Sequence, residues 1–313
     1  MPKFGTIHFD QALSNLSVGY KNGELVAERV FGRVPVEKQS DRYFIHSREN
    51  FRVREDLRAP GDEAKVSRWA LSDAPYFCDG HALKDYVPRE NSVDADPQLD
   101  LLNDTTEVLT DQVLLGQEAG LVAVLLAGMT GTSLASQVAT PWSNNANDPV
   151  ALIRAQAAVI AMRTGKWPNQ FVPSLSVWNA IQGNTNVTGR INGAQKLADA
   201  LVTPAQFASL IEVDEVVVAK AVQTTSAEGQ AITMALVWAN NALLQYKAPT
   251  PGRKTLSLGY TFTWDKAFGV GQPQFVNRYF WQPRLADCVE VHKYYDNRIV
   301  AVDAGVLFTN CHP

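Results

Sequence analysis

Two cysteine–histidine pairs are the residues of this chain whose types and spacing come closest to a metal site. Cys78 and His81 are three positions apart, and Cys288 and His292 are four apart. Two thiolates and two imidazoles form a ligand set that zinc accepts. However, about two hundred residues separate the pairs, and the second pair alternates with valines as along a strand. We therefore predict that all four side chains pack within the protein and hold no metal.

A glycine-rich stretch and two acidic pairs offer the other chemical possibilities. Residues 128–133 resemble part of a phosphate-binding loop, but they have no lysine before the threonine and follow a predicted helix instead of a strand. The pairs at 55–56 and 62–63 lie among arginines, where ion pairing or solvation is expected rather than acid–base catalysis. The sequence also contains no nucleophile elbow and no complete dinucleotide fingerprint. We predict no catalytic, cofactor-binding or metal-binding residues, and no enzyme.

Composition limits the classes of partner. The 313 residues are 46% apolar and 19% charged, which is typical of a soluble globular protein. A formal net charge of −4 argues against a broad surface that grips DNA or anionic lipid. The aromatic cluster at 279–281 is therefore predicted to anchor a core or an interface. Three scattered cysteines, no signal-peptide pattern and no apolar run longer than 119–127 predict a cytosolic protein without a membrane partner.

The elements that position these groups begin with a charged hairpin. Residues 41–68 carry thirteen charged side chains in twenty-eight positions, seven basic and six acidic, and β-type residues flank them on both sides. The turn sequence at 59–62, APGD, supplies a fixed φ and a permissive glycine. A strand over 43–53 would span roughly 35 Å, so the hairpin is predicted to project from its domain. Its balanced charges suit ion pairing with a protein better than binding to nucleic acid. A solvated flexible loop is the alternative.

An arm and a long helix are predicted on either side of this hairpin. Residues 1–37 mix glycines with short apolar runs, which indicates an extended arm that has little core of its own and lies on something else. Asp94 and Pro97 predict the start of a helix that continues to Ala127 and is roughly 45 Å long. We expect its buried stripe to comprise Leu101, Val108, Leu115, Ala119, Val122 and Leu126.

A compact α/β domain and long strands are predicted for the rest of the chain. Helices are expected at 149–164, 174–181 and 204–210, with a short strand at 170–173. Strands are expected at 213–222 and 231–246 around a polar loop, and at 255–264. Two final strands, 286–295 and 298–309, are predicted to form a long antiparallel hairpin that turns at residues 296–297.

Taken in order, these elements resemble those of the major capsid proteins of tailed phages. The matching stretches are residues 34–36 with Lys38 and Tyr43, residues 82–88, residues 149–181 with the turn at 167–169, and residues 289–308. The resemblance spans residues 30–311 and rests on the arrangement more than on any single motif. It implies an α+β capsid fold with an N-terminal arm (1–37), an extended hairpin loop and return (38–88), a peripheral domain (89–131 and 248–313) and an axial domain (132–247).

The resemblance implies a structural virion protein that forms hexamers and pentamers and closes an icosahedral shell around double-stranded DNA, assembled in the host cytoplasm. The hairpin residues expected to contact a neighbouring subunit are Arg48, Glu49, Arg52, Arg54, Glu55, Asp56, Arg58, Asp62, Glu63, Lys65 and Arg68. The residues expected at the capsomer axis are Gln223, Thr224, Thr225, Ser226 and Glu228.

The expected partners are further copies of the chain, a portal and in some cases a decoration protein. Some family members crosslink a loop lysine to a neighbour's asparagine, but Lys65 and Asn297 lack supporting local sequence, so no crosslink is predicted. Only about thirty residues precede the matching region, so we expect a separate scaffolding protein.

Two other functions are compatible with the sequence. An encapsulin-like compartment shares the architecture but stores enzymes, and retention of a protein guest would distinguish it. A soluble enzyme would require the hairpin to fold back as a lid over the α/β domain. Against the enzyme stands the absence of a convergent set of catalytic residues.

Overall fold

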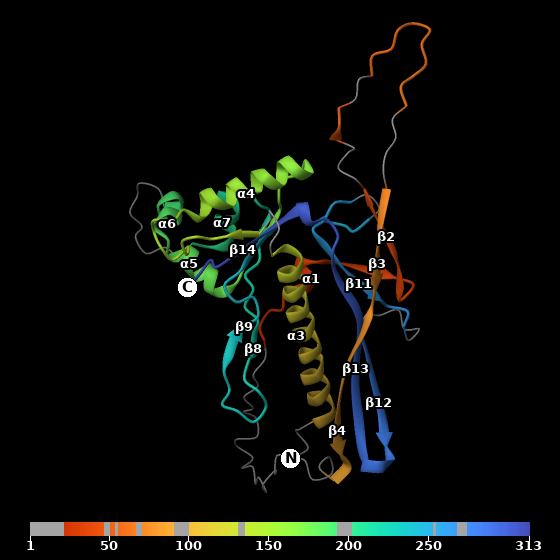
Figure 1. Cartoon of the computed structure of the whole chain (residues 1–313). Coiled ribbons are helices and arrows are strands. Elements are labelled where there is room, and N and C mark those ends of the chain that lie inside the picture. The colour runs from red at the N-terminus through yellow and green to blue at the C-terminus, as the bar shows by residue number, and fades with distance from the viewer. Residues whose placement is uncertain are drawn as a thin grey trace.

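The computed structural model describes residues 22–46, 51–53, 56–66, 71–90, 100–130, 135–192, 202–252, 255–267 and 274–313. Its helices are α1 (Ala27–Val30), α3 (Leu101–Met129), α4 (Pro149–Thr164), α5 (Leu175–Gly183), α6 (Thr185–Asn192) and α7 (Pro204–Ile211), with short 3-10 turns at Gln282–Arg284 and Val302–Ala304. Figure 1 shows α4, α5, α6 and α7 grouped on one side and α3 beside a column of long strands. A hairpin projects from the top of this column.

The first sheet is built on β13 (Ala286–Ile299), a strand of 14 residues. The strand order is β1–β11–β13–β12, and β4 also pairs with β13. The strands that pair directly with β13 are β4 (Asp79–Pro88), β11 (Gly259–Trp264) and β12 (Gln274–Trp281). β1 (Gly32–Val36) pairs with β11. Ala286 of β13 therefore lies opposite both Trp281 and Pro88, and the distal half of the strand has a partner on each edge.

The second sheet lies among the helices and has the order β5–β14–β10–β6–β7. Its strands are β5 (Ala135–Gln137), β6 (Gln170–Pro173), β7 (Glu215–Val216), β10 (Ala242–Gln245) and β14 (Gly305–Thr309). Every residue of β6 and β10 is buried. The last strand, β14, thus belongs to the second sheet, although the three strands before it, β11, β12 and β13, belong to the first sheet.

Two smaller hairpins complete the fold. β2 (Ser40–His46) pairs with β3 (Leu71–Phe77) at the base of the projecting hairpin. β8 (Val222–Thr224) pairs with β9 (Met234–Leu236) in a hairpin that lies beside α3 in Figure 1.

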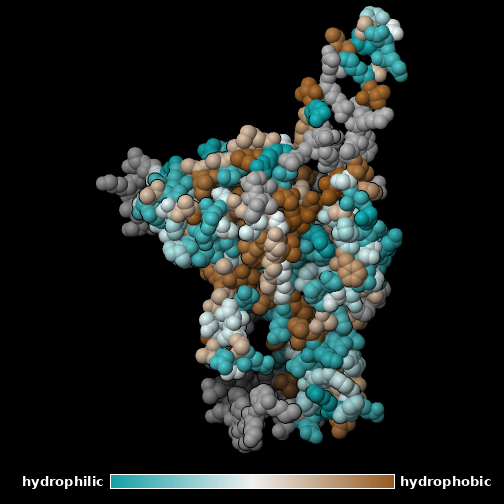
Figure 2. Space-filling view, in the orientation of Figure 1, coloured by the Kyte–Doolittle hydropathy of each residue, from teal (hydrophilic) through white to brown (hydrophobic). Residues whose placement is uncertain are grey.

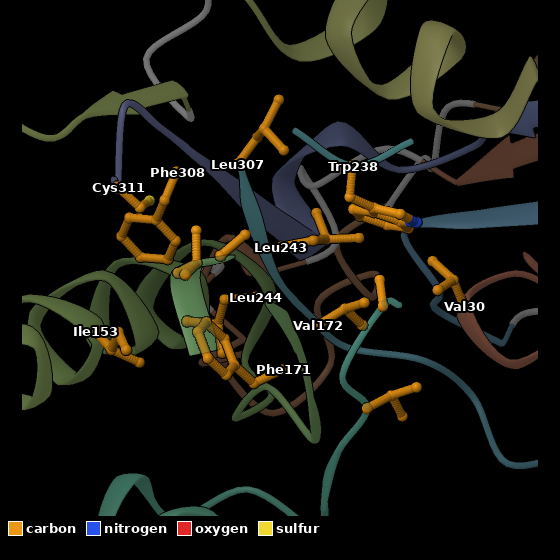
Figure 3. Close-up of a cluster of buried hydrophobic side chains, with 14 of the residues drawn as sticks. Val30, Ile153, Phe171, Val172, Trp238, Leu243, Leu244, Leu307, Phe308 and Cys311 are labelled. Atoms are coloured by element: carbon orange, nitrogen blue, oxygen red, sulfur yellow. The ribbon is translucent and has the colours of Figure 1, made fainter. Parts of the chain in front are cut away.

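One large hydrophobic core joins the second sheet, its helices and the upper half of α3. Trp238, Phe171 and Phe308 are fully or almost fully buried in it, and Figure 3 shows them converging with leucines of β10 and β14. Each such side chain stabilises the fold by about 1.5–3 kcal/mol. A second small cluster, made of Leu109 and Val113 of α3 with valines of β13, fixes the lower half of the helix to the first sheet.

The helix α3 differs from its prediction at its start and along its face. It begins at Leu101, and the side chain of Asp100 caps it by accepting from the Asn103 backbone N–H at 3.2 Å. The predicted start at Asp94 and Pro97 lies outside the described residues. The buried residues of the helix are Leu109, Val113, Gln117, Glu118, Leu121, Val122, Leu125 and Met129. Of the predicted stripe, Val122 belongs to this set, and Leu115, Ala119 and Leu126 are half-buried against the large core. Val108 is exposed, so the stripe is wrong at that position.

By length and composition alone, α3 could cross a membrane. In the fold, however, its buried face packs against β13 and β4 and carries two polar side chains, Gln117 and Glu118. The helix therefore acts as a structural element that joins the two sheets.

Most predicted elements of the α/β region are confirmed. α4 has the predicted bounds; Asp148 caps its start, and Gly165 ends it at a φ of 70°. β6 also has its predicted bounds, and α5 and α7 differ from theirs by one or two residues. Asp148 and Thr203 both accept backbone N–H groups of the first turn, which explains why these starts were predictable.

The predicted terminal hairpin is wrong. Residues 296–297 lie inside β13, which runs to Ile299, and β14 pairs with β10 in the second sheet. Asn297 is buried and accepts from the Thr261 hydroxyl at 2.8 Å across the β11–β13 pair. A residue pair typical of turns is thus held in a strand by a cross-strand partner.

Three other strand predictions are corrected in length. Only Glu215–Val216 and the first residue of β8 form strand within 213–222. The segment 231–246 is divided by a turn at 237–240 into β9 and β10. β11 begins at Gly259, later than predicted, and five of its six residues are buried, so the expected half-buried alternation is also wrong.

Candidate assembly surfaces

The base of the projecting hairpin is firmly attached to the first sheet. β2 and β3 pair over their full length, from Ser40↔Phe77 to His46↔Leu71. The rings of Tyr43 and Tyr76 both stack on Phe262 of β11, with centroids 5.4 and 4.7 Å away. The β2–β3 stem of the hairpin is therefore held against the first sheet, where Figure 1 shows the two strands.

The far end of the hairpin has few contacts with the rest of its own chain. We call residues 56–66 the hairpin tip. The predicted turn is confirmed there, because the Asp62 N–H donates to the Ala59 carbonyl at 3.1 Å and Gly61 has a φ of 93°. Every residue of the tip is exposed. Of the strand predicted at 43–53, residues 43–46 belong to β2, residues 47–50 lie outside the described part of the chain, and residues 51–53 are not strand, so the prediction is wrong for 51–53.

The charged residues predicted to contact a neighbour divide into two groups. Those that the structure describes are exposed: Arg52, Asp56, Arg58, Asp62, Glu63 and Lys65. The others lie outside the described residues: Arg48, Glu49, Arg54, Glu55 and Arg68.

The sequence analysis missed the apolar residues of this hairpin. Val53, Leu57 and Val66 are exposed by 95%, 80% and 76%, and Phe44 and Phe51 by 67% each. The signal was available in the sequence, since these residues interrupt the charged stretch at short intervals. Exposed apolar side chains gathered on one projection mark an interaction surface.

An open cleft lies at the base of the hairpin. Its volume is about 1290 Å³, and β1, β2, β11, the end of α4 and the segment 300–303 contribute to its lining. Of its lining residues, Tyr260 and Phe262 are buried, whereas Phe44 and Phe51 are exposed. Figure 2 shows hydrophobic surface gathered below the hairpin, between the helical side and the column of strands. We call this feature the stem cleft.

The residues predicted at the capsomer axis lie on the β8–β9 hairpin. Gln223 and Thr224 are part of β8, and Thr225, Ser226 and Glu228 belong to the loop that follows. The Thr225 N–H donates to the Thr233 carbonyl at 2.9 Å, and Ser226 accepts from the Thr233 N–H at 3.3 Å. The loop is thus polar but internally bonded.

Residues 22–36, which we call the clasp segment, contribute buried side chains to the core. They form α1 and β1, and β1 runs parallel to β11. Val26, Val30 and Phe31 are almost completely buried in the large core. These residues pack on other parts of the chain, as predicted for an arm with little core of its own, but the predicted extended conformation is wrong where they form α1. Residues 1–21 lie outside the described part of the chain.

Side chains of the second sheet bind the clasp segment by its backbone. Gln245 donates to the Val30 carbonyl at 2.8 Å, and Gln170 and Lys247 both donate to the Arg29 carbonyl, at 3.0 and 2.6 Å. Nearer the start of the segment, the Asn22 side chain pairs with both backbone groups of Val222, at the root of β8. The segment thus connects both sheets and the β8–β9 hairpin.

Glu118 of α3 attaches the clasp segment to the helix. Its fully buried carboxylate accepts from the Val26 backbone N–H at 2.7 Å and from the Trp238 indole N–H at 3.0 Å. Burial raises the pKa of Glu118, and these hydrogen bonds partly offset that effect. The residue joins three separate parts of the chain at one point.

Lys293 of β13 attaches the clasp segment to the first sheet and to α3. The side chain is only 2% exposed, and its Nζ donates to Glu28 of α1 at 3.0 Å and to Gln117 of α3 at 2.7 Å. A buried ammonium is stable only when it is paired and hydrogen-bonded, so Glu28 is its essential counter-ion.

A cluster of aromatic and basic side chains lies at the distal end of the long strands. Tyr279 and Phe280 of β12 are exposed, as is Leu285 in the turn to β13. The stacked pairs are Lys84 on Trp281, Arg89 on Phe280 and Arg284 on Tyr86, at 5.1, 4.2 and 4.8 Å from the ring centroids. Residues 279–281 are predicted to anchor a core or an interface. A role in an interface concerns contacts between copies, so it stays a prediction.

The cysteine–histidine pairs occupy ordinary packing positions. Cys78 is buried at the root of the hairpin with its thiol 3.6 Å from the Phe262 carbonyl, and burial raises its pKa to about 12. His81 stacks on Tyr295, and the Cys288 thiol is buried in β13. Among the described residues, no group of three or more histidine, cysteine or acidic side chains is placed to hold a metal.

Comparison with known proteins agrees with this geometry. No protein-family model matches the chain. It is 24% identical to the major capsid protein of Pseudomonas phage JBD67 over 96% of both chains. It is 22% identical to the major capsid protein of Burkholderia phage BcepMu over 76% of both chains.

Solved structures give the same result for the fold. A phage-related protein from Bordetella bronchiseptica RB50 has a TM-score of 0.71 at 21% identity, with 96% of this chain and 97% of that one covered. The capsid of cyanophage P-SCSP1u has a TM-score of 0.60 at 10% identity, with 98% and 92% covered. The chain has the phage capsid fold. This confirms both the fold class and the resemblance drawn from the sequence.

The capsid fold is shared with protein compartments. The SrpI encapsulin of Synechococcus elongatus PCC 7942 has a TM-score of 0.55 at 13% identity, covering 97% of this chain and 96% of the encapsulin. Both curated relatives, however, are named as structural proteins of phage capsids. Within the capsid fold, sequence similarity therefore favours the phage branch.

Proposed function

We propose that this chain is the major capsid protein of a phage, located in the virion, and that its copies close an icosahedral shell as hexamers and pentamers. The observation that carries the proposal is the projecting hairpin, whose charged and apolar side chains are exposed on the isolated chain. Exposed apolar groups of this kind become buried when copies associate. The similarity to two phage major capsid proteins supports the same role.

The parts of the chain would have distinct roles in the shell. We assign the first sheet with α3 to a peripheral domain and the second sheet with α4–α7 to an axial domain. The polar β8–β9 hairpin would face the capsomer axis, where five or six copies meet, and its residues 223–228 would make those contacts. The charged residues of the projecting hairpin would pair with a neighbouring subunit and fix its orientation.

The remaining proposed partners follow from the same role. The shell would enclose double-stranded DNA without reading its sequence, because a net charge of −4 gives no cationic surplus for broad phosphate contacts. A scaffolding protein and a portal are proposed partners in assembly, and a decoration protein is a further candidate. The chain would perform no catalysis.

Electron microscopy with sedimentation analysis tests the proposal. The purified chain, alone or with its candidate scaffold, is expected to form shells, tubes or rings of five and six. A triple variant, Arg52→Glu, Arg54→Glu and Arg58→Glu, should fold but fail to assemble, while the Arg→Lys version of the same three positions should assemble. A chain that stays monomeric under all these conditions would contradict the proposal. Shells that retain a protein guest would instead identify an encapsulin-like compartment.

A further inference from the structure

The clasp segment begins with an asparagine–glycine pair, Asn22 and Gly23, which is a chemically reactive sequence. The backbone nitrogen after an asparagine can attack the side-chain amide carbon, and glycine hinders this attack least because it has no Cβ. In the structure Gly23 is exposed. A Cβ built on it would meet no described atom within 4 Å beyond its chain neighbours. The surroundings of Gly23 therefore leave room for the attack.

Two hydrogen bonds fix the side chain of Asn22. Its Nδ2 donates to the Val222 carbonyl at 3.2 Å, and its Oδ1 accepts from the Val222 backbone N–H at 3.0 Å. The attack requires a defined approach of the Gly23 nitrogen to Cγ and turns the planar amide carbon into a tetrahedral one. Val222 holds both polar atoms of the planar amide, so the bound side chain resists this change of geometry.

The reaction balances with the chain and water alone. The Gly23 nitrogen forms a bond to Cγ of Asn22 and loses its proton, the bond from Cγ to Nδ2 breaks, and ammonia leaves with that proton. Water then opens the cyclic imide at either carbonyl and gives aspartate or isoaspartate. Neither product has the Nδ2 donor that binds the Val222 carbonyl, so the original pair of bonds cannot form again.

The rest of the clasp segment has attachments that do not involve this pair. The Val26 N–H donates to Glu118, and the Val30 carbonyl accepts from Gln245. The modification would therefore release only the link between the start of the segment and the root of β8.

We propose that Asn22–Gly23 is a spontaneous deamidation site, which the bonds to Val222 keep unreactive while the clasp segment is attached to β8. When the start of the segment detaches locally, the pair reacts as in an unfolded chain, so the folded rate is reduced by the fraction of time spent detached. Two hydrogen bonds of ordinary strength make the folded chain react at least about tenfold more slowly than the unfolded chain. The reaction concerns a single chain and does not rest on the proposed shell function.

Peptide mass spectrometry tests the site on the full chain. The folded chain and the chain in urea are incubated side by side at mildly alkaline pH, and the peptide with residue 22 is followed by the mass gained when –NH2 becomes –OH. Conversion should be at least about tenfold faster in urea. The other asparagine–glycine pair of the sequence, at 192–193, is the reference for the reaction in urea. No conversion of Asn22 in urea would overturn the site, and equal or faster conversion of the folded chain would overturn its protection.

A control at the glycine tests the chemistry. Gly23→Ala adds a Cβ that fits the open space and hinders the attack, so it should slow the conversion in urea several-fold. An unchanged rate would show that the mass gain does not arise by attack of this backbone nitrogen, and would overturn the assigned reaction.

Variants of Val222 test the protecting bonds. Val222→Pro removes the N–H that donates to Asn22 and should raise the folded rate toward the rate in urea. Val222→Thr keeps this N–H and is the matched control, which should react like the wild type. Circular dichroism and urea unfolding establish that both chains are folded. A folded Val222→Pro chain that reacts at the wild-type rate would overturn the protection by these bonds.

Hydrogen exchange in the wild type gives the same test without a variant. Exchange of the Val222 N–H and deamidation of Asn22 both require the same local detachment, so the two processes should be slowed by the same factor relative to the unfolded chain. Factors that differ by more than about tenfold would overturn the shared detachment step.

Discussion

The clasp segment and the hairpin tip are both short stretches outside the main helices, yet their side chains have opposite environments. Val26 and Phe31 of the clasp segment are fully buried, and its backbone carbonyls accept from two side chains of the second sheet, Gln245 and Gln170, and from Lys247. Leu57 and Val66 of the tip are exposed. Apolar residues therefore stabilise the monomer in the first region and are available for association in the second.

The two regions should therefore affect different free energies: the clasp segment that of unfolding of the single chain, and the hairpin tip that of association between copies. Changes in the clasp segment should alter the free energy of unfolding of the single chain. Changes in the hairpin tip should leave the free energy of unfolding unchanged and alter only assembly, because the exposed side chains of the tip make few contacts within the isolated chain. Four predictions test this division, ordered by their expected effect on the free energy of unfolding.

The largest effect is expected at Glu118. Glu118→Ala removes the acceptor of two buried donors, the Val26 N–H and the Trp238 indole N–H, and leaves a cavity in the core. Each orphaned donor costs about 1–3 kcal/mol, so the free energy of unfolding should fall by about 3–5 kcal/mol. Urea unfolding of the unassembled chain measures this. A fall below about 1 kcal/mol would show that the clasp segment contributes little to the monomer.

The Lys293–Glu28 pair should give a smaller effect with a diagnostic pattern. Glu28→Gln leaves the buried Lys293 ammonium without a counter-ion and should cost about 1–3 kcal/mol, reduced because Glu28 is itself 57% exposed. Lys293→Met removes the buried charge and should be nearly neutral. The double variant should recover most of the loss from Glu28→Gln. An additive double variant would show that the two residues act independently.

Glu118 should also make stability depend on pH. Its pKa is raised in the folded protein above the ordinary value of 4.5, so the folded state holds the proton more tightly than the unfolded state. The contribution of Glu118 therefore increases as the pH falls through the raised pKa and stops changing below about 4.5. The difference in unfolding free energy between wild type and Glu118→Gln, measured from pH 7 to 4, should show this slope. A difference that is flat across this range would exclude it.

The contrast between the two regions also shows what the sequence could predict. α4 and α7 were predictable because their ends depend on local chemistry, with Asp148, Thr203 and Gly165 acting within a few residues. The turn of the hairpin at Gly61 was predictable for the same reason. Such signals need no knowledge of distant parts of the chain.

The failures concern contacts between residues far apart in the sequence. The burial of the clasp segment depends on Gln245, Lys293 and Glu118, each of which is at least 92 positions away from the clasp residue that it bonds. Asn297 has a turn-forming residue type, and its bonds to Thr261 and to the Gln117 carbonyl explain its place in a strand. For the hairpin, attention to its charges concealed the apolar side chains between them, which now carry the proposed contact with a neighbour.

The smallest effect on unfolding is expected at the hairpin tip. Leu57→Asp replaces a side chain that is 80% exposed, so the free energy of unfolding of the isolated chain should change by less than about 0.5 kcal/mol. The same change should abolish ring formation, since an apolar side chain that is expected to become buried when copies associate would be replaced by a carboxylate without a partner. Leu57→Met is the matched control, which keeps the apolar contact and should assemble. If Leu57→Asp destabilises the monomer as strongly as Glu118→Ala, the tip contributes to its own fold, and the distinction between the two regions is lost.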